Sequence, residues 1–172
     1  LTRNNIIFET EKDLNVVNIH LEKILTSKVH PANGEGLSDN TQANGNENVY
    51  YLAFGSNPEE GDALYLGFNK SLEGEELTLA LYVNESDAGA CGNLEEHTSI
   101  VLRWECYKEG DWKNDKSWIS LVSANQQKAS PNLVEDETKN LTSRGKIRIK
   151  IGAGEKICST FIKSFDLFWI QI

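Results

Sequence analysis

KIRIKI, at residues 146–151, is the stretch of this chain that decides its fold class. Isoleucines and cations alternate strictly over it, and successive side chains of a β-strand point to opposite faces of a sheet. The stretch therefore predicts a strand with one buried aliphatic face and one exposed basic face. Lys139 and Arg144 extend the cations into a basic cluster, which we interpret as the solvated face of that strand. A docking stripe for an acidic partner is the alternative.

The same two-residue period recurs from residue 49 to the end of the chain, and turn residues such as Gly55, Pro58 and Gly61 interrupt it. Strands that recur at short intervals are typical of a β-sandwich or jelly roll, and not of alternating βαβ units. We therefore predict a mainly β, sandwich-like or jelly-roll-like fold. The expected strands are residues 49–54, 63–68, 77–83, 100–107, 146–151 and 165–172.

Residues 10–28 have the period of a helix instead. Thr10 and Asp13 resemble a capping box, and the apolar residues that follow recur at three- and four-residue steps. We predict one N-terminal amphipathic α-helix over 10–28, followed by a loop over 32–48 that is rich in Asn, Gly and Ser. The apolar stripe of the predicted helix is Leu14, Val17, Leu21, Ile24 and Leu25.

The composition indicates one soluble globular domain over residues 1–172, because 39% of the residues are hydrophobic and 25% are charged. The chain has no methionine, so we interpret it as a piece of a longer protein. Its three cysteines are odd in number and lack a CxxC spacing, which favours buried thiols in a reducing compartment. No stretch approaches the roughly 18 apolar residues that a membrane-spanning helix needs, so we expect no membrane contact.

The charge is unevenly distributed along the chain. Twenty-six acidic residues stand against seventeen Lys and Arg, a net charge of −9, and thirteen of the acidic residues lie within residues 35–96 beside the single Lys70. Phosphate backbones would be repelled by this balance. We therefore expect no nucleic-acid partner.

The histidines and the short motifs give no sign of catalysis. His20, His30 and His97 belong to no metal-ligand spacing, and the sequence holds neither a nucleophile elbow nor a phosphate-binding loop. We predict no catalytic residue, no cofactor and no metal ion, and therefore a protein that is not an enzyme. Asp136 with Thr138 indicates a turn, and Gly67 indicates a close approach of backbone to its neighbours.

A jelly-roll glycanase is the enzymatic alternative, because many such enzymes use two carboxylates beside a glycosidic bond. Glu105 would be one carboxylate, and Glu75 or Glu76 the other. The competing interpretation is that Glu105 belongs to the outward-facing set of its strand with Arg103, where an ordinary cross-strand ion pair explains it.

Tyr107, Trp112 and Trp118 are the candidate contact surface. Trp112 and Trp118 flank a polar stretch, which favours exposure, whereas Trp104 and Trp169 lie among aliphatic residues, which favours the core. Exposed aromatic side chains mark contacts with other proteins. In the alternative of a carbohydrate-binding module, they would form a platform for sugar rings.

Residues 104–112, which read WECYKEGDW, resemble the "WEYWDG..W" segment of baseplate assembly proteins from contractile tail-like injection systems, the family related to baseplate J and the phage baseplate wedge. Residues 8–14, 63–70 and 168–170 resemble that family's "F.TE.DL", "ALYLGFD" and "YWIR" segments in the same order. Gln171 stands where the family commonly has an arginine. The family's leucine and its "D.T..L..SG" segment are matched by Leu121, Asp136, Thr138, Leu141, Ser143 and Gly145.

The resemblance implies a structural, non-enzymatic domain of a baseplate subunit in a contractile phage-tail-like particle. Its partners would be other baseplate subunits, bound through protein-protein contacts, and it would be cytoplasmic during assembly and then part of the particle. The resemblance covers only the middle β-domain of such proteins. This agrees with the interpretation of the chain as a piece of a longer one.

Overall fold

The computed structural model describes residues 18–28, 36–46, 48–54, 58–82, 101–123 and 130–172. Strands dominate this part of the chain, so the prediction of a mainly β fold is confirmed. The elements are β1 (Leu21–Ser27), β2 (Leu37–Asp39), α1 (Thr41–Asn44), β3 (Ala63–Phe68), β4 (Glu76–Leu81), β5 (Trp104–Tyr107), the 3₁₀ turn η2 (Asp115–Ser117), β6 (Trp118–Ser123), β7 (Leu133–Asp136), β8 (Gly145–Lys150), β9 (Thr160–Ile162) and β10 (Phe165–Gln171).

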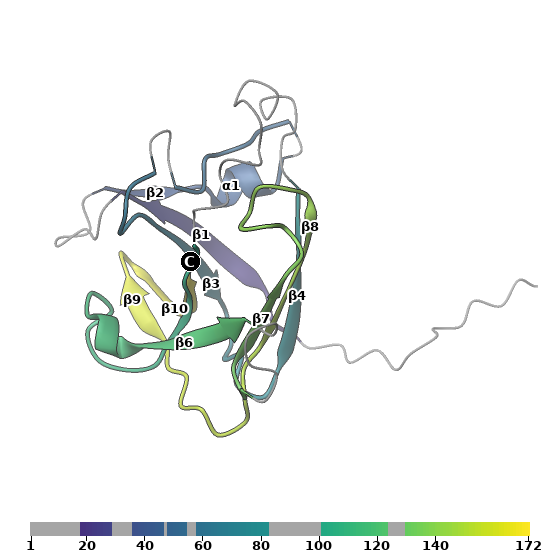
Figure 1. Cartoon of the computed structure of the whole chain (residues 1–172). Coiled ribbons are helices and arrows are strands. Elements are labelled where there is room, and N and C mark those ends of the chain that lie inside the picture. Colours follow the sequence, from purple (N-terminus) through teal and green to yellow (C-terminus); the bar gives the residue numbers. More distant parts are fainter. Residues whose placement is uncertain (1–17, 29–35, 47, 55–57, 83–100, 124–129) are drawn as a thin grey trace, which may run out of the picture.

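The strands form one hydrogen-bonded path in the order β2-β1-β3-β10-β5-β6-β7-β8-β4, and β9 pairs with β10 beside it. Each pair is antiparallel except β6 and β7, which run parallel over two residue pairs. Figure 1 shows that the path curls, so that β7, β8 and β4 turn away from the plane of β1 and β3. No helix in the described ranges is long and apolar enough to cross a membrane.

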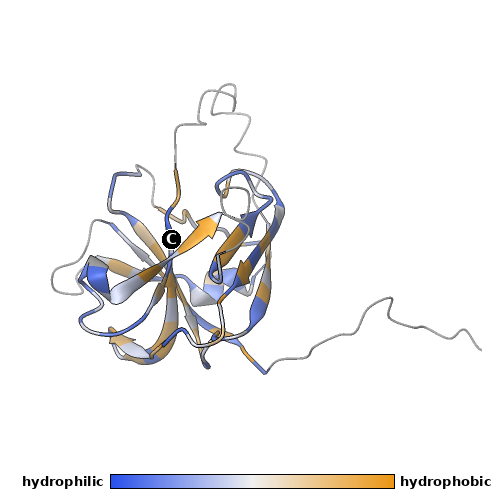
Figure 2. Ribbon diagram, turned by 60° about the horizontal axis from the view of Figure 1, so that its bottom comes forward, coloured by the Kyte–Doolittle hydropathy of each residue, from blue (hydrophilic) through white to orange (hydrophobic). Residues whose placement is uncertain are grey.

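Two apolar clusters hold the curled sheet, one on each face of its central strands. Figure 2 shows hydrophobic and hydrophilic residues following one another along the strands. Neighbouring residues of one strand divide between the two clusters: Ile24 joins one cluster and Leu25 the other. The inner core draws on both ends of the path and therefore lies inside the curl; it includes Ile24, Leu64, Leu66, Phe68, Trp104, Cys106, Val134, Ile147, Ile149 and Ile170. The outer core consists of Leu25, Leu37, Ala63, Tyr65, Tyr107, Trp118, Ile162 and Trp169.

Strand β8 has the two faces that its sequence predicts. Ile147 and Ile149 are buried in the inner core, and the residues that alternate with them, Lys146, Arg148 and Lys150, are exposed. Arg148 forms ion pairs with Glu135 and Glu137 at 3.2 and 2.9 Å. The interpretation of these cations as a solvated strand face is therefore confirmed for the three residues of β8.

The helix predicted over residues 10–28 is wrong for the described part, residues 18–28; residues 10–17 lie outside it. Residues 21–27 form β1, which pairs with β3 from Leu21–Phe68 to Ser27–Ala63 and with β2 on its other side. A strand that is buried on both faces needs apolar residues at adjacent positions, and such a set also matches helical spacing. Pairing with β3 decides between the two.

Three further boundaries differ from the prediction. The expected loop over 32–48 contains β2 and α1, although residues 32–35 and 47 lie outside the described part. The expected strand over 49–54 does not form, because its Tyr51, Ala53 and Phe54 pack against the inner core without pairing. Of the strand expected over 100–107, residue 100 lies outside the described part, and the rest is regular only at 104–107.

Candidate functional site

The outer face of the sheet carries an aromatic cluster made of Tyr65, Tyr107, Trp112 and Trp118. Tyr107 of β5 lies directly opposite Trp118 of β6, with ring centroids 5.6 Å apart and ring planes at 77°. Tyr65 of β3 meets the rings of Trp112 and Trp118 at 6.0 and 6.1 Å. Edge-to-face and tilted contacts of this kind are favoured by the quadrupoles of the rings.

The hairpin loop between β5 and β6 fastens this cluster to the sheet. Trp118 Nε1 donates a hydrogen bond to the Trp112 carbonyl oxygen at 2.8 Å, and the Tyr107 hydroxyl donates to the Gly110 carbonyl oxygen at 2.6 Å. Gly110 has a φ of +102°, and a Cβ there would lie 2.8 Å from Ser117 Oγ. The loop therefore folds back over the rings instead of presenting them to solvent.

The three predicted contact residues come together, but mostly as core. Tyr107 and Trp118 are 3% and 7% exposed, so neither offers a contact surface, and the expected exposure of Trp118 is wrong. Trp112 is half-buried and keeps part of its ring accessible. The polar residues that flank Trp118 in the sequence misled the prediction, because their loop covers it.

A polar row crosses the same face next to the cluster. Tyr65, Gln171, Glu105 and Ser120 are in register across β3, β10, β5 and β6. Glu105 accepts hydrogen bonds from Gln171 Nε2 and Ser120 Oγ, both at 3.3 Å, and forms an ion pair with Arg103 at 3.1 Å. In the described part of the chain, Gln171 Oε1 is the buried side-chain atom that has no hydrogen-bond partner.

Glu105 lies on the outer face of its strand as predicted, but it is buried, with 3% exposed. Its ion-pair partner is Arg103 as expected, although the pair joins two residues of one segment and not two strands. The Glu105 charge contributes to pKa shifts of two neighbouring residues. Burial, and secondly the Glu105 carboxylate, raise the pKa of Tyr65 to about 12. Burial, followed by the charges of Glu155 and Glu105, raises the pKa of the Cys106 thiol to about 12, so this thiol is protonated at neutral pH.

The carboxylate pair of the glycanase alternative is not assembled. Glu76 lies on the exposed face of β4 and Glu75 directly precedes that strand, and β6, β7 and β8 separate β4 from the β5 strand of Glu105. Glu105 is already bonded to three side chains. The described residues also hold no group of three metal-ligating side chains.

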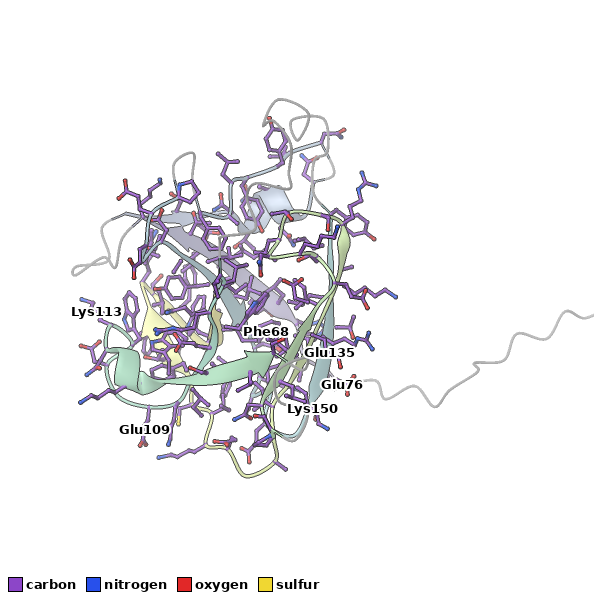
Figure 3. The ribbon with its side chains drawn as sticks, in the orientation of Figure 1. Phe68, Glu76, Glu109, Lys113, Glu135 and Lys150 are labelled. Atoms are coloured by element: carbon purple, nitrogen blue, oxygen red, sulfur yellow. The ribbon has the colours of Figure 1, made fainter. Side chains whose placement is uncertain are left out.

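The exposed face of β4, β7 and β8 carries charges of both signs, and Figure 3 shows Glu76, Glu135 and Lys150 close together on it. These residues, with Leu133 and Arg148, line a depression of about 70 Å³. Sites that enclose a small organic ligand typically have about 300 Å³ or more. The depression is therefore too small for such a ligand.

The turn that follows β7 is built around one carboxylate. Asp136 accepts hydrogen bonds from the Thr138 amide at 2.6 Å, from the Thr138 hydroxyl at 2.5 Å and from the Asn140 amide at 3.0 Å. Residues 139–141 have φ values of 54°, 60° and 62°, a left-handed path that costs energy for residues other than glycine. The Asp136–Thr138 turn predicted from the sequence is confirmed.

The remaining residues of the "D.T..L..SG" segment complete the same turn. The Leu141 amide donates to Thr138 Oγ1 at 2.9 Å, and the Ser143 hydroxyl donates to the Thr138 carbonyl oxygen at 3.0 Å. A Cβ on Gly145 would lie 3.0 Å from the Glu137 backbone, and one on Gly67 would lie 2.7 Å from the Trp169 ring. The residues that carry the family resemblance are thus packing and turn residues.

No protein-family model matches the chain, and none of the curated proteins shows detectable sequence similarity to it.

Proposed function

We propose that this chain is a structural, non-enzymatic β-domain of a baseplate subunit in a contractile phage-tail-like particle, and that it acts through protein-protein contacts with other baseplate subunits. The ordered resemblance to baseplate assembly proteins motivates the proposal. One observation carries it: residues of the resembling segments, among them Asp136, Thr138 and Gly67, hold turns and close packing in this fold. Residues of that kind mark a shared architecture, and not a shared active site.

We also propose that the curled sheet is a variant of a β-sandwich or jelly roll. The inner core supports this, because it lies between the β1-β3-β10-β5 part of the sheet and the β7-β8 part, as a core lies between the two layers of a sandwich. Superposition of the chain on known sandwich and jelly-roll domains tests this architecture: a strand path that matches neither arrangement would contradict it.

The test of the function uses the native host. Contractile particles are purified by sedimentation and probed with an antibody raised against the chain, and the coding segment for residues 1–172 is then deleted. We expect the chain to co-sediment with particles, and the deletion to leave particles without complete baseplates in electron micrographs. A chain found only in the unsedimented fraction, with normal particles after the deletion, would contradict the proposal.

A carbohydrate-binding module is the alternative, and Trp112 favours it, because this residue is only half-buried and Lys113 Nζ lies 5.8 Å from the centroid of its ring. Glycan titration that follows tryptophan fluorescence separates the two functions. Saturable binding that is lost in Trp112→Ala and kept in Lys113→Ala would support the module. Absence of binding to a broad glycan array would remove it.

A further inference from the structure

Within the described residues, the outer edge of β4 is open along its whole length. β4 is the last strand of the path and pairs with β8 through six consecutive residue pairs, from Glu76–Lys150 to Leu81–Gly145, without a bulge. In the described part of the chain, no strand pairs with its other side. An unpaired edge presents a row of N–H and C=O groups that a further strand can bond.

The direction of these backbone groups follows from one hydrogen bond. The Ile151 amide donates to the Glu75 carbonyl oxygen at 3.2 Å, so the backbone of Glu75 faces β8. Alternate residues of an antiparallel strand bond to the same side. Leu77, Leu79 and Leu81 therefore bond to β8, whereas Glu76, Thr78 and Ala80 direct their N–H and C=O groups outward.

The opposite edge of the sheet is protected, whereas no described residue outside β4 protects the β4 edge. β2 is three residues long, its Asp39 pairs with Lys23 at 3.0 Å, and its Leu37 carbonyl oxygen accepts a hydrogen bond from Lys163 Nζ at 2.6 Å. β4 is six residues long and contains no lysine, arginine or proline. Length, flatness and the absence of blocking residues are the features that allow edge-to-edge pairing.

The β4 sequence is also complementary to itself. When a second copy is laid antiparallel with Leu79 opposite Leu79, Leu77 lies opposite Leu81, Thr78 opposite Ala80, and Glu76 opposite Tyr82. Facing residues then belong to the same side of the continued sheet: the half-buried leucines lie together on the core side. Tyr82, now 82% exposed, gains a neighbour. Shifting the two-fold axis to Thr78 would instead place Leu81 opposite Glu75.

Charge does not oppose this register. In the register that β4 and β8 share, Arg148 lies beside Thr78 and Lys146 beside Ala80. Across the two copies, Arg148 of one and Lys146 of the other are then separated by three interstrand steps, about 14 Å. This exceeds the screening length of about 8 Å at physiological salt. No like charges lie directly opposite each other on the paired edges.

We propose that the outer edge of β4 pairs with the same edge of a second copy of this chain, antiparallel about Leu79, and continues the sheet across a two-fold axis. Because the interface includes only one strand from each copy, it is smaller than the roughly 1,200 Å² of a standard interface. We expect a reversible dimer with a dissociation constant in the micromolar range. The inference does not depend on the proposed baseplate function.

Sedimentation velocity over a hundred-fold range of concentration tests the pairing. Thr78→Pro removes an outward N–H but no bond to β8, and proline is tolerated where the N–H of an edge strand faces solvent. Thr78→Ala keeps that N–H and is the matched control. We expect dimers at high concentration for the wild type and Thr78→Ala, and monomers throughout for Thr78→Pro. A monomeric wild type, or a folded Thr78→Pro that dimerises like the wild type, would overturn the proposal.

Disulfide trapping tests the register independently of the proline variant. In a Cys91→Ser, Cys158→Ser background, Leu79→Cys places two thiols opposite each other at a non-hydrogen-bonded pair, where the Cα separation of about 4.5 Å suits a disulfide. Ala80→Cys places its thiol opposite Thr78. We expect covalent dimers from Leu79→Cys under mild oxidation and at least ten-fold fewer from Ala80→Cys. Equal yields would contradict the two-fold axis at Leu79.

Discussion

The aromatic cluster and the β4 edge differ in opposite ways between the exposure that their sequences suggest and the exposure that the fold gives them. Tyr107, Trp112 and Trp118 have the composition of a contact surface, but the β5–β6 loop folds over them and leaves only part of Trp112 accessible. β4 has the composition of an ordinary half-buried strand, but its place at the end of the sheet leaves its outer backbone without a paired strand in the part of the chain that the structure describes. Aromatic content is therefore a poor guide to the surface that this protein offers.

The largest expected effect is a loss of stability on substitution of the buried tryptophan of the aromatic cluster. Trp118→Ala removes a 7% exposed indole that contacts Tyr65 and Tyr107, and we expect the free energy of unfolding to fall by about 3–5 kcal/mol. Trp112→Ala, at the half-buried rim, is the control, and we expect a clearly smaller loss. Denaturant unfolding measures both. Equal losses would mean that the two rings are buried alike.

A second change tests how tightly the outer core is packed. A Cβ at Gly67 would lie 2.7 Å from the Trp169 ring, which is held by a hydrogen bond from its Nε1 to the Thr160 carbonyl oxygen. We expect Gly67→Ala to cost about 1–3 kcal/mol of stability by overpacking. Gly45→Ala, whose new Cβ would find its nearest atom at 3.7 Å, is the control with little expected effect. Matching melting temperatures for the two variants would contradict this.

The dependence of stability on acid pH tests the contribution of Asp39 at the protected β2 edge of the sheet. The hydrogen bond from the Thr41 hydroxyl, helped by Lys23, lowers the pKa of Asp39 from 3.8 to about 2. A carboxylate with a lowered pKa stabilises the fold above pH 3.8 and loses this contribution as the pH falls towards 2. Because Asp39 is 37% exposed and screened by water, we expect less than about 1 kcal/mol.

The measurement for this edge is a series of denaturant unfolding curves between pH 5 and the lowest pH at which the chain stays folded. Asp39→Asn removes the titrating group and should give a flatter dependence of stability on pH than the wild type. Parallel curves for the two proteins would show that the Asp39 carboxylate contributes nothing at the β2 edge.

The smallest expected effect is at the open edge itself. Thr78 lies on the exposed face of β4, so Thr78→Lys should change the stability of the monomer by no more than about 0.5 kcal/mol. Unfolding is followed at a concentration too low for association. A larger loss would indicate that Thr78 packs against the rest of the chain, and the contrast between the two regions would then disappear.

Local pattern predicted the parts of the fold whose burial is one-sided or whose chemistry is local. β8 alternates Ile with Lys or Arg, and its faces are those expected. β3, β4 and β10 also form close to their predicted bounds. The Asp136–Thr138 turn follows from side chains and backbone only a few residues apart.

The errors in the predicted elements share one cause, which is that burial by distant segments leaves no clear period in the local sequence. β1 resembles a helix because Ile24 and Leu25 are buried on opposite faces, and an apolar set of this kind has no period of two. β6, β7 and β9 were not predicted: β7 and β9 have only four and three residues, and β6 mixes buried and half-buried positions without alternation. A helical or strand period identifies an element only when it continues over a longer segment than these strands provide.

The sequence by itself determined that this chain is mainly β, that its cations at residues 146–150 face solvent, and that Asp136 and Thr138 form a turn. Each of these properties is written in the order of side chains within one short segment. Only the tertiary structure decided that residues 21–27 are a strand, that Trp118 and Glu105 are buried, and that β4 ends the sheet. Those outcomes depend on which distant segment lies alongside, and the free energy of that pairing is not encoded in any local period.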